Sequence, residues 1–240
     1  EPDKIVVVAD HTVPAPSIAA ANAMKRMRAF VERFGIEKFY AEGRHGIAHV
    51  VLGEDGLALP GMTIACDYSH SCSSCALNCL ARGLGLADMM YALCKGQAWY
   101  MVGSTIKIIL EGELSDRVYA RDILHHIAHV HGAFPGHNLE WDGDAVAAMP
   151  MQGRFTLATL SAELSAEFSL FPHDAMLAAY LQDRASKPYD PVAPDPDANY
   201  EDTIRIDVST LEPLVVLPNK VAHNAAPARE LGESKIDQAF

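Results

Sequence analysis

Four consecutive β-branched residues near the start of the chain, Ile5 to Val8, are the strongest constraint on its fold. A strand with such residues at every position is typical of a parallel sheet that is buried on both faces. Asp10 and His11 follow at the carboxyl end of this strand. A helix is expected next, capped by Ser17 and ended by Gly35, because apolar residues recur between them at helical spacing. The chain therefore opens with a strand and a helix, which predicts an α/β fold.

The alternation of strand and helix continues along the chain. Turn residues and changes in the spacing of apolar residues set the expected bounds. The segment 72–95 is expected to be helical, with interruptions at Gly83 and Gly85. The other expected elements are strands at 46–53, 63–66, 105–111, 138–141 and 203–208, and helices at 122–131, 156–167 and 174–185.

These elements predict two α/β domains with mostly parallel or mixed sheets. We expect the first domain at residues 1–103, the second at 104–211 and an extended linker at 212–240, whose residues 235–240 resemble the start of a strand. The 240 residues, half of them hydrophobic, can bury a core of this size. Because the chain opens directly on a strand without an initiator Met, we expect a fragment or a processed piece.

The charge and cysteine content restrict the class of protein. Nineteen Lys and Arg against 31 Asp and Glu give a formal net charge of −12, which disfavours binding to nucleic acid or to anionic lipid. No apolar run approaches the roughly 18 to 20 residues that span a bilayer, and the N-terminus does not resemble a signal peptide. Five cysteines, four of them close together, do not form a disulfide framework. We therefore expect a cytoplasmic protein.

Acidic and histidine residues fall at the predicted strand ends. Asp10 and His11 follow the first strand, His49 lies in the second, and the run from Cys66 to Ser71 follows the third. Because the carboxyl ends of strands in an α/β sheet gather at one crevice, these side chains can converge there. A histidine beside a carboxylate is suited to proton transfer near neutral pH. The alternative is that these histidines are separate surface residues.

Two further groups of residues can each be explained in two ways, as a metal site or as part of the packing of the fold. Cys72, Cys75 and Cys79 share one helical face, with Cys66 shortly before them, so they can ligate zinc or an iron–sulfur cluster. Packing of small buried side chains is the favoured explanation. His125 and His129 have the spacing of two zinc ligands on a helix, but the general-base Glu between them is absent. We favour an amphipathic helix with histidines in solvent and with Ile123, Ile127 and Val130 facing inward.

Several motifs resemble those of a known family. Asp10 to Pro14 is similar to D-H-x-[VI]-P, Gly46 to His49 to G-I-x-H, and Tyr68 to Ser71 to D-S-H-T. Further fitting segments are Leu59 to Ile64, Thr105 to Ile108, Gly153 to Leu157 and Ile236 to Phe240. On these residues the sequence resembles the aconitase superfamily, most closely the large subunits of 3-isopropylmalate dehydratase and homoaconitase.

The resemblance implies three-layer α/β/α domains around a [4Fe-4S] cluster with one iron open to substrate. The implied activity is that of a hydro-lyase, which dehydrates and rehydrates a hydroxy di- or tricarboxylic acid such as 3-isopropylmalate, in leucine biosynthesis. The iron would act as a Lewis acid on the departing hydroxyl, which a histidine protonates. A small swivelling subunit is the implied partner.

The resemblance also assigns roles to individual residues. It implies that Asp10 and His11 are an acid pair, that His49 and His70 stand around the iron-bound oxygens, and that Glu163 is a buried carboxylate at the cluster. The other residues expected near the substrate or the cluster are Tyr68, Ser69, Ser71 and Thr159.

The sequence departs from the family at several positions. Tyr68 stands where the family has Asp, and Thr159 where it commonly has Asn. The family's cluster-binding motif G-S-C-T-N and the later C-x-x-C that follows it are absent, and G-S-C-T-N is expected directly after Phe240. One hypothesis is an enzyme part that needs a cluster-bearing segment and the small subunit. The alternative is a catalytically degenerate binding or structural subunit. Either way, we expect an exposed apolar surface where a cluster domain would dock.

Overall fold

The first strand and helix form where the sequence predicts them. In the computed structural model, which describes residues 1–233 and 235–238, strand β1 (Val6–Val8) pairs in parallel with β2 (Lys38–Tyr40), and helix α1 (Ile18–Phe34) connects them. The Ser17 hydroxyl accepts a hydrogen bond from the backbone N–H of Ala20 at 3.2 Å, and Gly35 ends the helix with a φ of 64°. All three residues of β1 are half-buried. The strand is therefore less buried than the sequence predicts for one that is covered on both faces.

The second expected strand is wrong, because its residues form helix α2 (Ala48–Glu54). The run of apolar residues from Ile47 to Leu52 is short, and such a run suits a strand and a helix segment equally. In the helix, Val51 is buried while Val50 is exposed, so only one side of the run packs inward. His49 therefore lies in the first turn of a helix and not at a strand end.

The expected helical segment at 72–95 is only partly correct. It contains the end of a 3₁₀-helix, η2 (Ser69–Leu77), then strand β4 (Leu80–Gly83) and helix α3 (Leu86–Lys95). Strand β4 pairs in parallel with β3 (Thr63–Cys66), which forms as predicted. Non-local pairing with β3 therefore decides the conformation of β4 against the local helical pattern.

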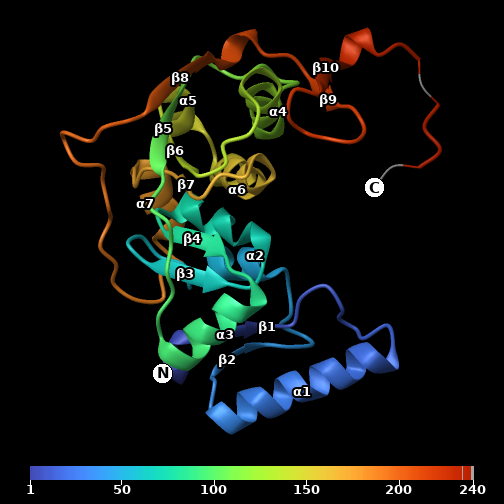
Figure 1. Ribbon diagram of the computed structural model, residues 1–240, viewed down its shortest axis with the longest axis vertical. Helices are drawn as coiled ribbons and strands as arrows, with labels where there is room; N and C mark the ends of the chain where they lie inside the picture. Colours follow the sequence, from blue (N-terminus) through green and yellow to red (C-terminus); the bar gives the residue numbers. More distant parts are fainter. Residues whose placement is uncertain (234, 239–240) are drawn as a thin grey trace.

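The second half of the chain is built on a parallel four-stranded sheet of order β7-β6-β5-β8. Figure 1 shows α4 and α6 on the same side of this sheet. Its strands are β5 (Ser104–Glu111), β6 (His137–Asp142), β7 (Ser169–Leu170) and β8 (Asp202–Asp207). Its helices are α4 (Ala120–His131), α5 (Asp144–Ala148), α6 (Met151–Leu160) and α7 (Ala175–Leu181), with 3₁₀-helix η3 (Ser161–Leu164) after α6.

The inward face of α4 is rotated from the expected one. Ile123 and Ile127 are buried as predicted, but 51% of Val130 is exposed, and Leu124 and Ala128 are buried instead. The buried stripe therefore ends before the last turn. His125 and His126 are half-buried and not fully in solvent, and burial lowers the pKa of both imidazoles.

The tail after residue 211 contains an antiparallel pair, β9 (Leu214–Val216) and β10 (Ala225–Pro227). It packs on α4, where the Asp122 carboxylate accepts from the backbone N–H of Leu214 at 2.9 Å. Residues 235–238 have no regular secondary structure, and the rest of the strand expected at 235–240 lies outside the described residues.

The fold class is confirmed as mixed α/β with mostly parallel sheets. One cluster of buried apolar side chains includes Leu59 and Cys75 in the first half of the chain and Ile108 and Trp141 in the second. The core therefore continues across the boundary expected near residue 103. Among the described residues, no helix is both long and apolar enough to cross a membrane.

Candidate functional site

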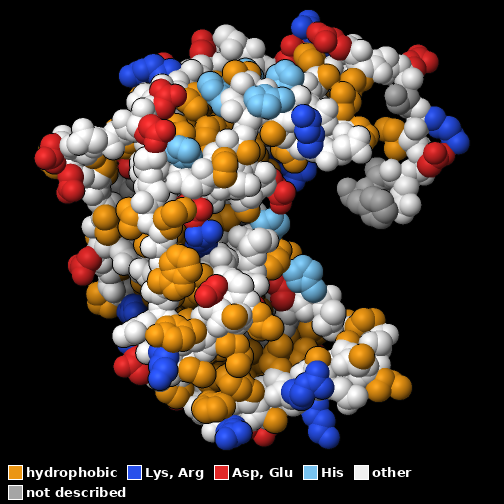
Figure 2. All heavy atoms as spheres, viewed as in Figure 1, with side chains coloured by type: hydrophobic (Ala, Val, Ile, Leu, Met, Phe, Trp, Pro, Cys, Tyr) orange, Lys and Arg blue, Asp and Glu red, His pale blue; other side chains and the backbone are white. Residues whose placement is uncertain are grey.

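Tyr68, which lies between β3 and η2, is surrounded by three histidines. Its ring stacks on that of His49 with a centroid distance of 5.6 Å and an interplanar angle of 9°. The rings of His11 and His70 meet it edge-on at 5.6 and 5.3 Å. These side chains come from the loop after β1, from α2 and from η2, so residues far apart in the sequence form one cluster. Figure 2 shows a molecule hollowed between α1 and the C-terminal tail, with histidine side chains along part of the hollow.

Asp10 fixes the geometry of the first pair. Its carboxylate accepts hydrogen bonds from the backbone N–H of Ala48, at 2.8 Å, and from the backbone N–H of His11, at 2.6 Å. Nδ1 of His11 lies 2.7 Å from the same carboxylate. The carboxylate side chain is mostly buried, whereas 64% of the His11 side chain is exposed. The pair therefore has a fixed base and an imidazole that a ligand can reach.

His49 is half-buried within the cluster. Its Nδ1 is buried and has no hydrogen-bond partner within residues 1–233 and 235–238. Burial is the main cause that lowers the pKa of His49, the neighbouring His70 lowers it further, and Asp10 acts in the opposite direction. His49 is therefore neutral at neutral pH.

His70 links Tyr68 to Glu163. Its Nδ1 lies 3.2 Å from the Tyr68 hydroxyl, and its Nε2 lies 3.4 Å from a carboxylate oxygen of Glu163. Glu163 belongs to η3, and the expectation that it is buried is wrong: 49% of its side chain is exposed. The physical reason is the short 3₁₀ turn, in which Ser161 and Leu164 face the core and Glu163 faces outward.

The other residues that the sequence predicts for the site, Ser69, Ser71 and Thr159, have different contacts. The Ser71 hydroxyl is buried and donates to the backbone carbonyl of Tyr68, which fixes the start of η2. The backbone carbonyls of Ser69 and Thr159 both accept from the thiol of Cys72. Ser69 also lines a pocket of about 520 Å³.

The clustered cysteines pack in the core. Cys72, Cys75 and Cys79 are buried, and the thiols of Cys75 and Cys79 donate to the backbone carbonyls of Ala81 and Leu59 at 3.3 and 3.0 Å. Burial raises the pKa of Cys72 to about 12 and that of Cys75 to about 11, and it also raises the pKa of Cys79. Such thiols stay protonated and are poor ligands. In the part of the chain that the structure describes, Cys66 and its neighbours do not form a metal-binding group.

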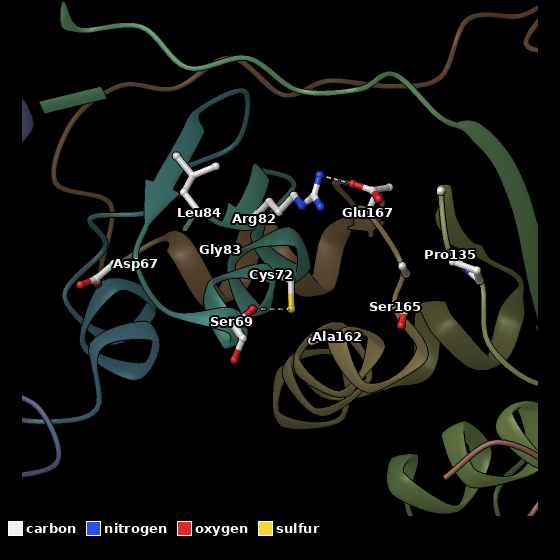
Figure 3. Close-up of a pocket in the computed structure, with 12 residues that line it drawn as sticks. Asp67, Ser69, Cys72, Arg82, Gly83, Leu84, Pro135, Ala162, Ser165 and Glu167 are labelled. Atoms are coloured by element: carbon white, nitrogen blue, oxygen red, sulfur yellow. Dashed lines mark hydrogen bonds and ion pairs between the residues drawn. The ribbon is translucent and has the colours of Figure 1, made fainter. Parts of the chain in front are cut away.

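The pocket beside Ser69 contains residues that sequence reasoning missed. Figure 3 shows Arg82 of β4 and Glu167 pointing toward each other, and the two form an ion pair. Asp67 lines the same pocket, whereas Tyr68 packs among the histidines. No local pattern connects Arg82 with Glu167, which is far away in the sequence. The strand that carries Arg82 was moreover expected to be a helix.

Comparison with known proteins shows the family to which the chain is similar. The profile described as "Aconitase family (aconitate hydratase)" matches residues 2–239. The chain is 43% identical to the 3-isopropylmalate dehydratase large subunit of Mycolicibacterium smegmatis over 237 residues, which are 99% of the chain and 56% of that protein. It is 39% identical to large subunit 1 of this dehydratase from Methanopyrus kandleri and 36% identical to large subunit 2 from Rubrobacter xylanophilus. All of the chain matches 57% of each of these two, so it spans a little over half the length of its relatives.

Proposed function

The chain belongs to the aconitase family, and we propose that it contributes the acid–base residues of a hydro-lyase active site. The substrate in this proposal is a hydroxy di- or tricarboxylic acid such as 3-isopropylmalate, because relatives are named as large subunits of that dehydratase. The observation that carries the proposal is the meeting of Asp10, His11, His49 and His70 around one tyrosine. We also propose a role in leucine biosynthesis, which the family resemblance implies, and a cytoplasmic location, which the sequence predicts.

In this proposal the Asp10–His11 pair supplies the proton that the departing hydroxyl takes up. The Asp10 carboxylate holds Nδ1–H of His11, so the exposed Nε2 is the nitrogen that can give a proton to a departing hydroxyl. The reverse reaction, hydration, needs the same nitrogen to remove a proton from water. A single pair therefore serves both directions.

The second proton position is the His70–Glu163 pair. The carboxylate is half-exposed and can accept from Nε2–H of His70. His49 is neutral, so it can contribute polarity and shape to the cluster without adding a positive charge. Thr159 and Ser69 lie close by through their backbone contacts with Cys72.

The described residues do not fit a [4Fe-4S] cluster by themselves. The three buried thiols are protonated and bound to backbone carbonyls, and no group of three ligand side chains forms within the described ranges. We therefore propose that the cysteine ligands come from a cluster-bearing segment or subunit. A small swivelling subunit is the second partner in this proposal, as the large-subunit names of the relatives suggest.

A specific observation favours the alternative of a degenerate subunit. The ring of Tyr68 occupies the position between three imidazoles, and Nδ1 of His49 has no hydrogen-bond partner among the described residues. In this alternative the histidines remain from an ancestral site, and the chain binds or supports a partner.

Reconstitution separates the two candidates. The chain would be co-expressed with a segment that supplies the cluster cysteines and with a small subunit, and hydration of unsaturated dicarboxylates would be assayed. We expect activity that falls by about 10²- to 10⁴-fold in His11→Ala, the usual contribution of a general acid. The control is His137→Ala, which removes a partly buried histidine from a different His–Glu pair, with Glu201.

The outcomes differ clearly. Equal activity of His11→Ala and of the unchanged chain contradicts the proposed acid. Lack of activity in the unchanged chain, together with measurable turnover in Tyr68→Asp, supports the degenerate subunit.

A further inference from the structure

A continuous line of polar contacts runs through Tyr68, His70 and Glu163. The Tyr68 hydroxyl lies 3.2 Å from Nδ1 of His70, and Nε2 of the same ring lies 3.4 Å from the Glu163 carboxylate. The imidazole therefore has a different partner on each nitrogen, and the chemistry of these partners restricts where its proton lies.

The restriction comes from the Glu163 end of the line. An ionised carboxylate only accepts hydrogen bonds, so Nε2 of His70 must carry a hydrogen to contact it. In a neutral imidazole the other nitrogen, Nδ1, is then an acceptor. The Tyr68 hydroxyl is the group beside Nδ1, and it can satisfy this nitrogen only by donating its O–H.

The surroundings of Tyr68 keep this O–H in place. Burial raises the pKa of the phenol, and the charges of Asp10 and Cys66 raise it further. The ring is held on one face by the stacked ring of His49, with His11 against it edge-on. The hydroxyl is therefore both protonated and directed toward His70.

We propose that Tyr68 is a positioning residue that donates its O–H to Nδ1 of His70 and so keeps the proton of the neutral imidazole on Nε2, facing Glu163. This inference rests on the proposed function, because it names the atom at which the second proton is held. A carboxylate at residue 68 could not donate, since it only accepts.

The tautomer can be observed directly by NMR on the full chain labelled with ¹⁵N-histidine. The spectra would be recorded at a pH where the His70 imidazole is neutral, and long-range ¹H–¹⁵N correlations distinguish the two neutral tautomers. We expect the Nε2–H form for His70. A dominant Nδ1–H form would overturn the proposal.

The variant Tyr68→Phe removes the O–H and keeps the aromatic ring that stacks on His49. We expect the Nδ1 resonance of His70 to move toward that of a nitrogen without a hydrogen bond, with a larger share of the Nδ1–H tautomer. His137 is the internal control, because it pairs with Glu201 outside the cluster. An unchanged His70 spectrum in this variant, with an unchanged His137 spectrum, would overturn the proposal.

A second variant guards against misfolding of the first. Glu163→Gln changes a half-exposed side chain, and its amide can donate as well as accept. We expect the Nε2–H form of His70 to persist in this variant, because Tyr68 still donates to Nδ1 and the amide oxygen of Gln still accepts from Nε2–H. A switch to the Nδ1–H form would show that Glu163, and not Tyr68, sets the tautomer, and would count against the proposal. None of these spectra depends on turnover. An inactive reconstituted enzyme with the expected tautomer would therefore contradict the proposed function alone.

Discussion

Individual residues show how the polar groups of this chain are paired in its core. Arg154, which lies in the segment 153–157 that fits the family, is fully buried and forms two hydrogen bonds with the Asp174 carboxylate, at 2.9 and 2.6 Å. Its guanidinium also donates to the backbone carbonyls of Val146 and Met149. Asp174 in turn caps α7 by accepting from the backbone N–H of Leu177. One ion pair therefore connects α5, α6 and α7.

We expect Asp174→Ala to lower the free energy of unfolding by about 3 to 5 kcal/mol, because it leaves the charge of Arg154 buried without its partner. Urea denaturation followed by circular dichroism measures this change. Asp183→Ala, on an exposed residue shortly after α7, is the matched control. A loss below 1 kcal/mol in Asp174→Ala would show that the pair contributes little.

The same carboxylate predicts a pH dependence of stability. Burial alone raises the pKa of Asp174, but the hydrogen bonds and charge of Arg154 and the N–H of Leu177 together lower it. Because the folded-state pKa is below the unfolded one, near 3.9, the stabilisation is fully present above about pH 4 to 5 and is lost as the pH falls through the folded value. We expect the unchanged chain to lose stability relative to Asp174→Ala as the pH falls below 4. Parallel curves for the two proteins would contradict this.

Secondary-structure elements differ in how far local sequence determines them. Helix α1 was predictable because Ser17 and Gly35 act on their own neighbours. Helix α2 and strand β4 were not, because short apolar runs carry no clear period and their conformation depends on distant partners. The site divides in the same way. Asp10 and His11 follow a strand that local sequence identifies, whereas the contact of His70 with Glu163 joins residues that no local pattern connects.

The 3₁₀-helix η2 predicts a pattern of thiol reactivity. Cys72, Cys75 and Cys79 are buried and protonated, while Cys94 of α3 is exposed. We expect alkylation of the native chain, followed by mass spectrometry, to modify Cys94 first and these three only after denaturation. Rapid native alkylation of Cys75, whose side chain is fully buried, would contradict the packing described for η2.

At the scale of the whole molecule, an apolar surface remains uncovered on the described residues. Every residue of α3 is at least partly exposed, and Leu86, Met90 and Tyr91 are more than half exposed. Trp99 is 74% exposed and Val102 is 94% exposed in the segment that follows α3. Exposed apolar areas of this kind mark docking surfaces. We propose that a segment bearing the iron–sulfur cluster covers this surface. We also propose that the chain divides into domains at residues 1–103 and 104–211, with a linker at 212–240.

The uncovered surface predicts self-association of the chain on its own. We expect sedimentation velocity to show larger species whose share rises with concentration, and the pair Leu86→Glu and Trp99→Glu to reduce that share, because charges oppose burial of the surface. Val192→Glu is the control on another exposed apolar residue. A sharp monomer at high concentration would contradict the docking proposal.

The central claim is spatial: histidines from three separate parts of the chain meet around Tyr68. Nuclear Overhauser effects between the ring protons of Tyr68 and those of His11, His49 and His70 test it most directly. The centroid distances of 5.3 to 5.6 Å predict cross-peaks from Tyr68 to all three imidazoles. Their absence in a folded chain, with the expected cross-peaks between Trp141 and Phe171 present in the core, would contradict the account.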